Sequence, residues 1–258
     1  MTHQVLAKQV NSDLYPDVAA AGTLSNALGQ MLAEIGSPLQ TAGELPFLSY
    51  ARVERGSRNC QMYIAAHERL FMFDFWSKGV AYGNGSCSSL ESAAQAIHHW
   101  ITEEPNIADM QSRFSFFSPT EQGLAHEAGR IVDYQWDRLI QTWTSSEERR
   151  SDTRSPLPLI LAAQNHPELR QLFPFTSLNS LRFSRTTGWP FTNDCPFAVP
   201  IGNGHFRAYP ATDREGVGDP LGEGDADEVI AILIAHLPPN CGPAVDGTED
   251  DLIEHRPG

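Results

Sequence analysis

The sequence predicts an α+β protein with two related strand-rich halves, each an antiparallel sheet followed by a helix, joined by a helical connector. Two regions, residues 47–82 and 180–209, alternate apolar and polar residues as strands do. The segments around them repeat apolar residues at helical spacing. Each half also places a Gly-x-Gly sequence directly before a helical segment. This shared order predicts a duplicated unit, either as one bilobal domain or as two tightly packed domains.

The first half begins after an N-terminal helical segment, residues 1–46, in which residues 23–35 have helical spacing and Gly36 and Pro38 follow. Residues 47–104 then form the first sheet-plus-helix half. The alternation predicts strands at residues 47–53, 62–64, 70–76 and 80–82, and a turn at 83–86. The pair Ser88 and Glu91 predicts the cap of the following helix.

The connector covers residues 105–177 and carries the longest helical pattern, residues 120–143, which begins at a Thr120 cap. Residues 145–155 are polar throughout, which predicts an exposed linker. Two shorter helices are expected at 157–164 and 167–172.

The second half, residues 178–258, repeats the strand pattern and ends in an acidic tail. Residues 180–184 alternate, and residues 197–200 and 205–209 flank Gly202-Asn203-Gly204, which is a strong hairpin signal. Asp225 is expected to cap a final helix that ends near Leu237.

The formal net charge is −14 and the pI is about 5.0, with 18 Lys and Arg against 32 Asp and Glu. Such a surface repels phosphate, so nucleic acid and anionic membranes are poor partners, whereas a cationic partner fits. The first residues lack a signal-peptide pattern, no apolar run is long enough for a membrane span, and the four cysteines show no CxxC spacing. We therefore expect a cytoplasmic protein with reduced thiols, no metal and no cofactor.

The candidate ligand-binding residues lie between positions 182 and 207, where cationic and aromatic side chains share one β region. Three arginines face a single aspartate there, which predicts surplus positive charge for a substrate carboxylate beside an aromatic wall. The predicted ligand-binding residues are Arg182, Arg185, Trp189, Asp194 and Arg207. His205 is a weak catalytic candidate, and no catalytic residue is otherwise identified. The alternative is that each arginine pairs with a carboxylate or reaches water along the sheet.

Other patterns favour structural roles. Gly83-Asn84-Gly85-Ser86 would suit phosphate at a helix N-terminus, but the equivalent Gly222-Glu223-Gly224-Asp225 is acidic, so a structural turn is the simpler interpretation. The adjacent His98 and His99 diverge on a helix and make a poor metal site. Cys87 has no identifiable His or Asn partner for covalent catalysis.

Four strings carry a family resemblance: residues 14–22 (LYPDVAAAG), 167–177 (PELRQLFPFTS), 181–184 (LRFS) and 236–244 (HLPPNCGPA). Together they resemble DUF6193, an actinobacterial family of unknown function whose members are often labelled natural-product biosynthesis proteins. The resemblance implies a pathway protein that binds a small molecule or modified peptide, with a possible cofactor-free isomerisation, cyclisation or elimination. The alternative is a non-catalytic binding, self-protection or scaffold protein for a cationic partner. Whether the chain is an enzyme stays open.

Overall fold

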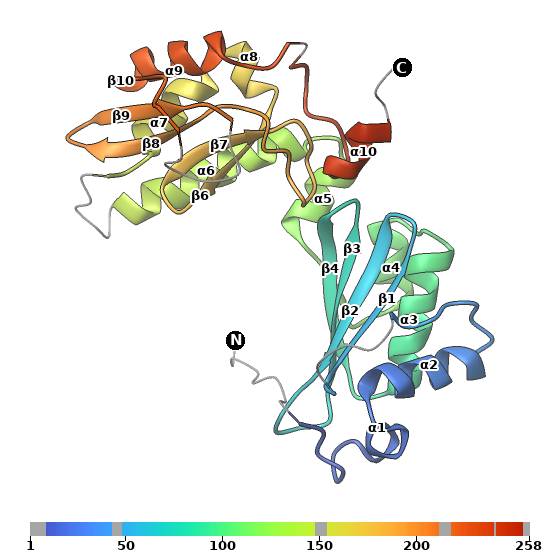
Figure 1. The fold of residues 1–258 in the computed structure, drawn as a ribbon. Helices are drawn as coiled ribbons and strands as arrows, with labels where there is room; N and C mark the ends of the chain where they lie inside the picture. Colours follow the sequence, from blue (N-terminus) through green and yellow to red (C-terminus); the bar gives the residue numbers. More distant parts are fainter. Residues whose placement is uncertain (1–8, 43–47, 148–153, 212–217, 240, 255–258) are drawn as a thin grey trace. The chain divides into compact units, whose positions relative to one another are not determined.

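The computed structural model describes residues 9–42, 48–147, 154–211, 218–239 and 241–254. The chain divides into two compact units, which we call unit 1 (residues 1–128) and unit 2 (residues 129–258). Each unit contains a five-stranded antiparallel sheet with helices (Figure 1). The α+β class and the two strand-rich halves are therefore confirmed.

Unit 1 places its sheet, in the order β1-β2-β3-β4-β5, against helices α2 and α3. Alternate residues such as Val53, Met62 and Phe73 are buried against these helices, and the residues between them face the opposite side. We call that opposite side the outer face of sheet 1. The elements of unit 1 are α1 (Pro16–Ala21), α2 (Leu24–Glu34), β1 (Tyr50–Arg55), β2 (Arg58–Ile64), β3 (Phe71–Ser77), β4 (Val80–Cys87), α3 (Leu90–Thr102), α4 (Ile107–Arg113), β5 (Phe117–Pro119) and α5 (Glu121–Glu127).

The predicted turn at Gly83–Ser86 is wrong, because β4 continues through it to Cys87. Gly83 and Gly85 are instead sites of close approach: a side chain at Gly83 would collide with the ring of Phe117, and one at Gly85 with the ring of Phe73. The cap of α3 is Ser89 rather than Ser88, since the Ser89 hydroxyl accepts a hydrogen bond from the Ser92 backbone N–H.

Unit 2 also has a sequential antiparallel sheet, β6-β7-β8-β9-β10. Its core forms where Leu181, Phe183 and Phe206 pack with residues of α6, α7 and α9. The predicted hairpin at Gly202–Gly204 and the Asp225 cap are confirmed; Asp225 and Glu228 form a complete capping box. The elements are α6 (Ile131–Glu147), α7 (Leu157–Gln164), α8 (Pro167–Arg170), β6 (Phe173–Ser177), β7 (Ser180–Ser184), β8 (Phe197–Gly202), β9 (His205–Tyr209), β10 (Gly222–Gly224), α9 (Ala226–Ala235) and α10 (Glu249–Glu254).

The long helix predicted for residues 120–143 is two helices. Helix α5 ends at Glu127, and α6 begins at Ile131 after Gly129, whose φ of +66° interrupts helical geometry. This break is also where the two units meet in sequence, so the helices of the expected connector belong partly to unit 1 and partly to unit 2. Of the expected linker at 145–155, residues 145–147 form the last turn of α6 and residues 148–153 lie outside the described residues.

The two units share a run of four strands and a helix. In unit 1 the Gly-x-Gly sequence lies in β4, and in unit 2 it lies in β10; each strand pairs antiparallel with the strand before it. A capped helix follows in both cases and packs back on the sheet, α3 in unit 1 and α9 in unit 2. The remaining strand differs, because β5 pairs with β4 whereas β6 pairs with β7 at the other edge. That the two runs superimpose stays a prediction.

Candidate functional site

The predicted site residues fall into two groups in unit 2. Arg182 on β7 and Arg207 on β9 share the face of the sheet opposite to its core, which we call the outer face of sheet 2. Arg185, Trp189 and Asp194 lie in the connection between β7 and β8. Trp189 is 68% exposed and His205, at the start of β9, is also exposed.

Each of the three arginines has its own partner. Arg185 Nε donates a hydrogen bond to Oδ2 of Asp194 at 2.9 Å, and its Nη2 lies 2.5 Å from the same oxygen as an ion pair. Arg207 donates to Oε1 of Glu223 at 2.5 Å, and the guanidinium of Arg182 lies 3.9 Å from the centre of the Phe197 ring. Glu223 and Phe197 thus contact two of the arginines that were predicted to bind the carboxylate of a ligand.

The connection that holds Arg185 and Asp194 is fixed by buried hydroxyl groups. The Ser184 hydroxyl accepts hydrogen bonds from the backbone N–H groups of Thr186 and Thr192, and the Thr192 hydroxyl accepts one from the Arg185 N–H. The backbone also bonds to the C-terminal segment, since Thr187 N–H donates to the Val245 carbonyl. The Arg185–Asp194 pair therefore lies in a loop whose conformation is held by internal hydrogen bonds.

A surface hollow of about 410 Å³ lies elsewhere in unit 2, at the start of α6. Its lining includes Arg130, Asp133, Arg170 and Ala244, and it contains none of the predicted site residues. Arg170 and Asp133 lie 3.9 Å apart across it and are both well exposed. The ion pair that lines this hollow is therefore exposed to solvent.

The outer face of sheet 1 carries a row of polar residues that crosses all five strands. The cross-strand register places the following residues side by side, one from each strand in order: Arg52, Gln61, Asp74, Asn84 and Ser118. Arg52 pairs with Glu54 on its own strand, at 2.6 Å, with both side chains partly exposed. The cation of the row is thus ion-paired through Nη2, although its Nε atom is buried without a hydrogen-bond partner among the described residues.

Asp74, at the centre of this row, is half-buried and forms no hydrogen bond or ion pair with any described residue. Burial raises the pKa of its carboxyl group, because the charged form loses hydration and gains nothing in return. An unpaired and partly desolvated carboxylate costs folding free energy. Asp74 is therefore a carboxylate that a cation from outside the chain could stabilise.

Aromatic side chains flank the row on the same face. Tyr50 and Tyr63 pack with ring centroids 5.0 Å apart on one side of it, and Trp76 lies two residues beyond Asp74 on the other. Trp76 Nε1 and Oδ1 of its cross-strand neighbour Asn59 are buried without a hydrogen-bond partner among the described residues. The face therefore combines a half-buried carboxylate with aromatic rings.

Asp74 was not predicted as a site residue, although the sequence carries a signal for it. Residues 71–76 read Phe-Met-Phe-Asp-Phe-Trp, so a lone charge stands in an otherwise apolar strand. The strand itself was predicted, but the cross-strand neighbours of Asp74 come from β2 and β4, whose register the sequence did not define.

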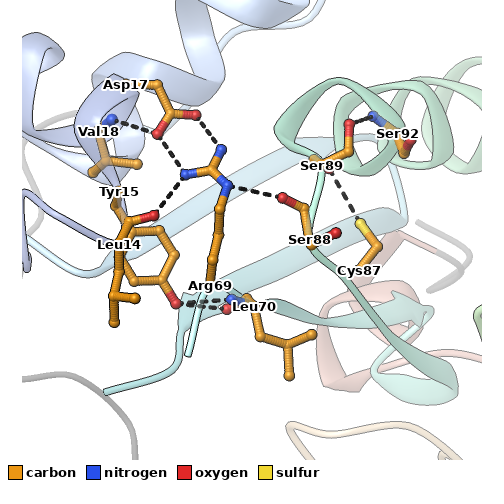
Figure 2. Close-up of polar contacts among 10 residues, drawn as sticks. All are labelled: Leu14, Tyr15, Asp17, Val18, Arg69, Leu70, Cys87, Ser88, Ser89 and Ser92. Atoms are coloured by element: carbon orange, nitrogen blue, oxygen red, sulfur yellow. Dashed lines mark hydrogen bonds and ion pairs between the residues drawn. The ribbon is translucent and has the colours of Figure 1, made fainter. Parts of the chain in front are cut away.

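A second polar cluster of unit 1 has a structural role (Figure 2). Arg69 donates two hydrogen bonds to Asp17, at 2.9 and 2.7 Å, and others to the carbonyls of Leu14 and Ser88. The Tyr15 hydroxyl contacts three carbonyls, among them that of Leu70, and accepts the Leu70 N–H. These bonds tie the Leu14–Gly22 string to the β2–β3 connection, so this string is explained by packing.

A family model matches residues 130–248, which is most of unit 2; its description is "Family of unknown function (DUF6193)". This part of the chain therefore resembles that family, as the sequence predicted. The Leu14–Gly22 string lies outside the match. No curated protein and no solved structure matches the chain.

Two structural observations concern membranes and metals. No helix in the described part of the chain is long and apolar enough to cross a membrane. Within the same described ranges, no group of three or more His, Cys, Asp or Glu side chains is arranged to hold a metal ion.

Proposed function

We propose that this chain is a non-catalytic binding protein for a cationic partner, and that the partner contacts the outer face of sheet 1. The observation that carries the proposal is Asp74, a half-buried carboxylate without a partner in the described chain, between aromatic side chains. A Lys, Arg or amine group of the partner would pair with this carboxylate.

The energetics favour a cation in this position. The carboxylate has already lost part of its hydration in the free protein, so an incoming ammonium or guanidinium group forms a charge-assisted bond with less desolvation cost. Tyr50, Tyr63 and Trp76 supply ring faces that attract cations.

The charge of the whole chain supports the same class of partner. A formal charge of −14 attracts a basic partner over long range and raises its association rate, most strongly at low salt. The cytoplasmic location, expected from the cysteine usage, remains part of this proposal.

A small anionic ligand of a natural-product pathway is the second candidate function. It is supported by the resemblance of unit 2 and by the arginines and aromatic rings on the outer face of sheet 2. Because Arg185 and Arg207 already hold carboxylates and Arg182 lies over a ring, we favour the cationic partner.

The test is calorimetric titration of the full chain with a short Lys/Arg-rich peptide and with a Glu/Asp-rich peptide of equal length. We expect the basic peptide alone to bind, and Asp74→Asn to weaken it by about 10- to 100-fold, the loss of one charge-assisted hydrogen bond. Glu34→Gln is the matched control, because it removes one exposed negative charge from α2 and should leave the affinity nearly unchanged. Equal weakening by both variants would reduce the effect to net charge and contradict the site.

A further inference from the structure

Two of the four cysteines contact each other in unit 2. Cys195 stands just before β8, and Cys241 follows α9, yet their Sγ atoms are 4.0 Å apart. Cys195 is 5% exposed, whereas Cys241 is partly exposed. A reagent in solution therefore reaches the Cys241 sulfur first and has the Cys195 sulfur directly behind it.

The surroundings of this pair favour a thiolate at Cys241. The two sulfur atoms share a hydrogen bond that either thiol can donate. This contact and the positive charge of the nearby Arg185 guanidinium lower the pKa of Cys241. The same contact raises the pKa of Cys195, which keeps its proton. Burial raises the pKa of the other two thiols, Cys60 and Cys87.

The position of Arg185 is itself fixed. Its side chain is bound to Asp194, the residue before Cys195, and its backbone N–H is bound to Thr192. On the other side, the Gln171 side-chain amide donates to the Cys241 carbonyl. The thiolate and the cation that stabilises it are thus held by separate parts of unit 2 in a defined arrangement.

We propose that Cys241 and Cys195 form an oxidisable dithiol, a modification site at which a peroxide converts the pair to an intramolecular disulfide. The Cys241 thiolate attacks one peroxide oxygen, the O–O bond breaks, and hydroxide leaves, which gives a sulfenic acid at Cys241. Cys195 then loses its proton, its sulfur attacks the Cys241 sulfur, and the S–O bond breaks with release of water. In total, two thiols and one hydrogen peroxide give one disulfide and two waters, and two electrons pass from sulfur to peroxide.

The new bond would close the chain from Cys195, just before β8, to Cys241 in the segment that follows α9. This loop contains β8, β9, β10 and α9, which are four elements of the unit 2 sheet and core. A cross-link of this length stabilises chiefly by restricting the unfolded chain. Oxidation is therefore expected to raise the unfolding temperature of unit 2. The inference is independent of the cationic partner proposed for unit 1.

The experiment treats the full-length protein with hydrogen peroxide and maps its cysteines by mass spectrometry. We expect loss of two hydrogen atoms from the intact mass, a cross-linked peptide that joins Cys195 to Cys241, and recovery of both thiols with dithiothreitol. Cys87→Ser is the matched control, because it removes another partly exposed thiol and should leave the cross-link intact.

Two further measurements keep the proposal testable if a variant folds poorly. In the unmodified protein, iodoacetamide should alkylate Cys241 before Cys60, Cys87 and Cys195. In Cys195→Ala, peroxide should take Cys241 to a sulfenic acid that persists or is oxidised further. Alkylation of Cys87 ahead of Cys241, or oxidation of Cys241 to sulfinic acid without a cross-link in the unmodified protein, would overturn the proposal.

Discussion

The outer faces of the two sheets differ in whether their charged side chains have partners within the fold. On sheet 2, Arg207 has a carboxylate within 2.5 Å and Arg182 lies over an aromatic ring. On sheet 1, Arg52 is paired with Glu54, but the central Asp74 is half-buried and has no partner among the described residues. A charged residue in a strand therefore indicates a binding site only when the fold does not already supply its partner.

The same contrast appears within unit 1. Asp17 is held by Arg69, and this pairing lowers the pKa of the Asp17 carboxyl group (Figure 2). Asp74 has no such bond, and burial raises the pKa of its carboxyl group. The charged forms of these two aspartates therefore have opposite effects on folding stability. Charged Asp17 stabilises the fold, whereas charged Asp74 costs folding free energy.

The largest stability effect among the charges compared here is expected for Arg185→Ala in unit 2. The change removes the hydrogen bond and the ion pair to Asp194 and leaves that carboxylate without its cation. Because the pair is partly exposed, we expect a loss of about 1–2 kcal/mol in the free energy of unfolding. Urea denaturation of the full chain measures it, and an unchanged midpoint would show that the pair contributes nothing.

The pH dependence of unit 1 should separate Asp74 from the paired aspartates. The folded-state pKa of Asp74 lies above its ordinary value of 3.8, so the folded protein holds this proton more tightly than the unfolded chain. Wild-type stability should therefore fall as pH rises above 3.8 through the raised pKa, whereas Asp74→Asn should lack this part of the decline. Denaturation across this pH range gives both curves, and parallel curves would contradict the assigned environment.

The smallest effect is expected for Arg207→Ala. Its ion pair with Glu223 lies at the surface, where water replaces the lost contact at little cost. We expect no measurable change in the unfolding midpoint. A loss of unfolding free energy as large as that of Arg185→Ala would contradict this expectation. It would mean that the Arg207–Glu223 pair is more enclosed than the exposure of its side chains indicates.

Much of this fold was predictable from local sequence signals. The hairpin at Gly202–Gly204 and the cap at Asp225 follow from the residues themselves, since turn geometry and capping bonds are short-range. The Gly-x-Gly sequences at residues 83–85 and 222–224 were predicted as turns but lie in strands β4 and β10. A side chain at Gly85 would collide with the Phe73 ring on the neighbouring strand, and this contact depends on strand pairing that the local sequence does not show. The helix break at Gly129 was missed because the apolar spacing continues on both sides of it.

The site was less predictable than the fold. The sequence placed three arginines near one aspartate, but Glu223, which binds Arg207, comes from a strand 16 residues away. The importance of Asp74 likewise depends on Gln61 and Asn84, which become its neighbours only through the register of β2 and β4. Whether a charged side chain has a partner depends on the assembled sheet. The residue types along the chain therefore could not predict it.

The most direct test of the account measures stability and binding on the same Asp74→Asn protein at neutral pH. We expect a higher free energy of unfolding than wild type, by about 0.5–1 kcal/mol, because an uncompensated carboxylate is removed. We also expect weaker binding of the Lys/Arg-rich peptide. A variant that is less stable than wild type, or one that binds the peptide as tightly, would contradict the claim that Asp74 is kept for a cationic partner.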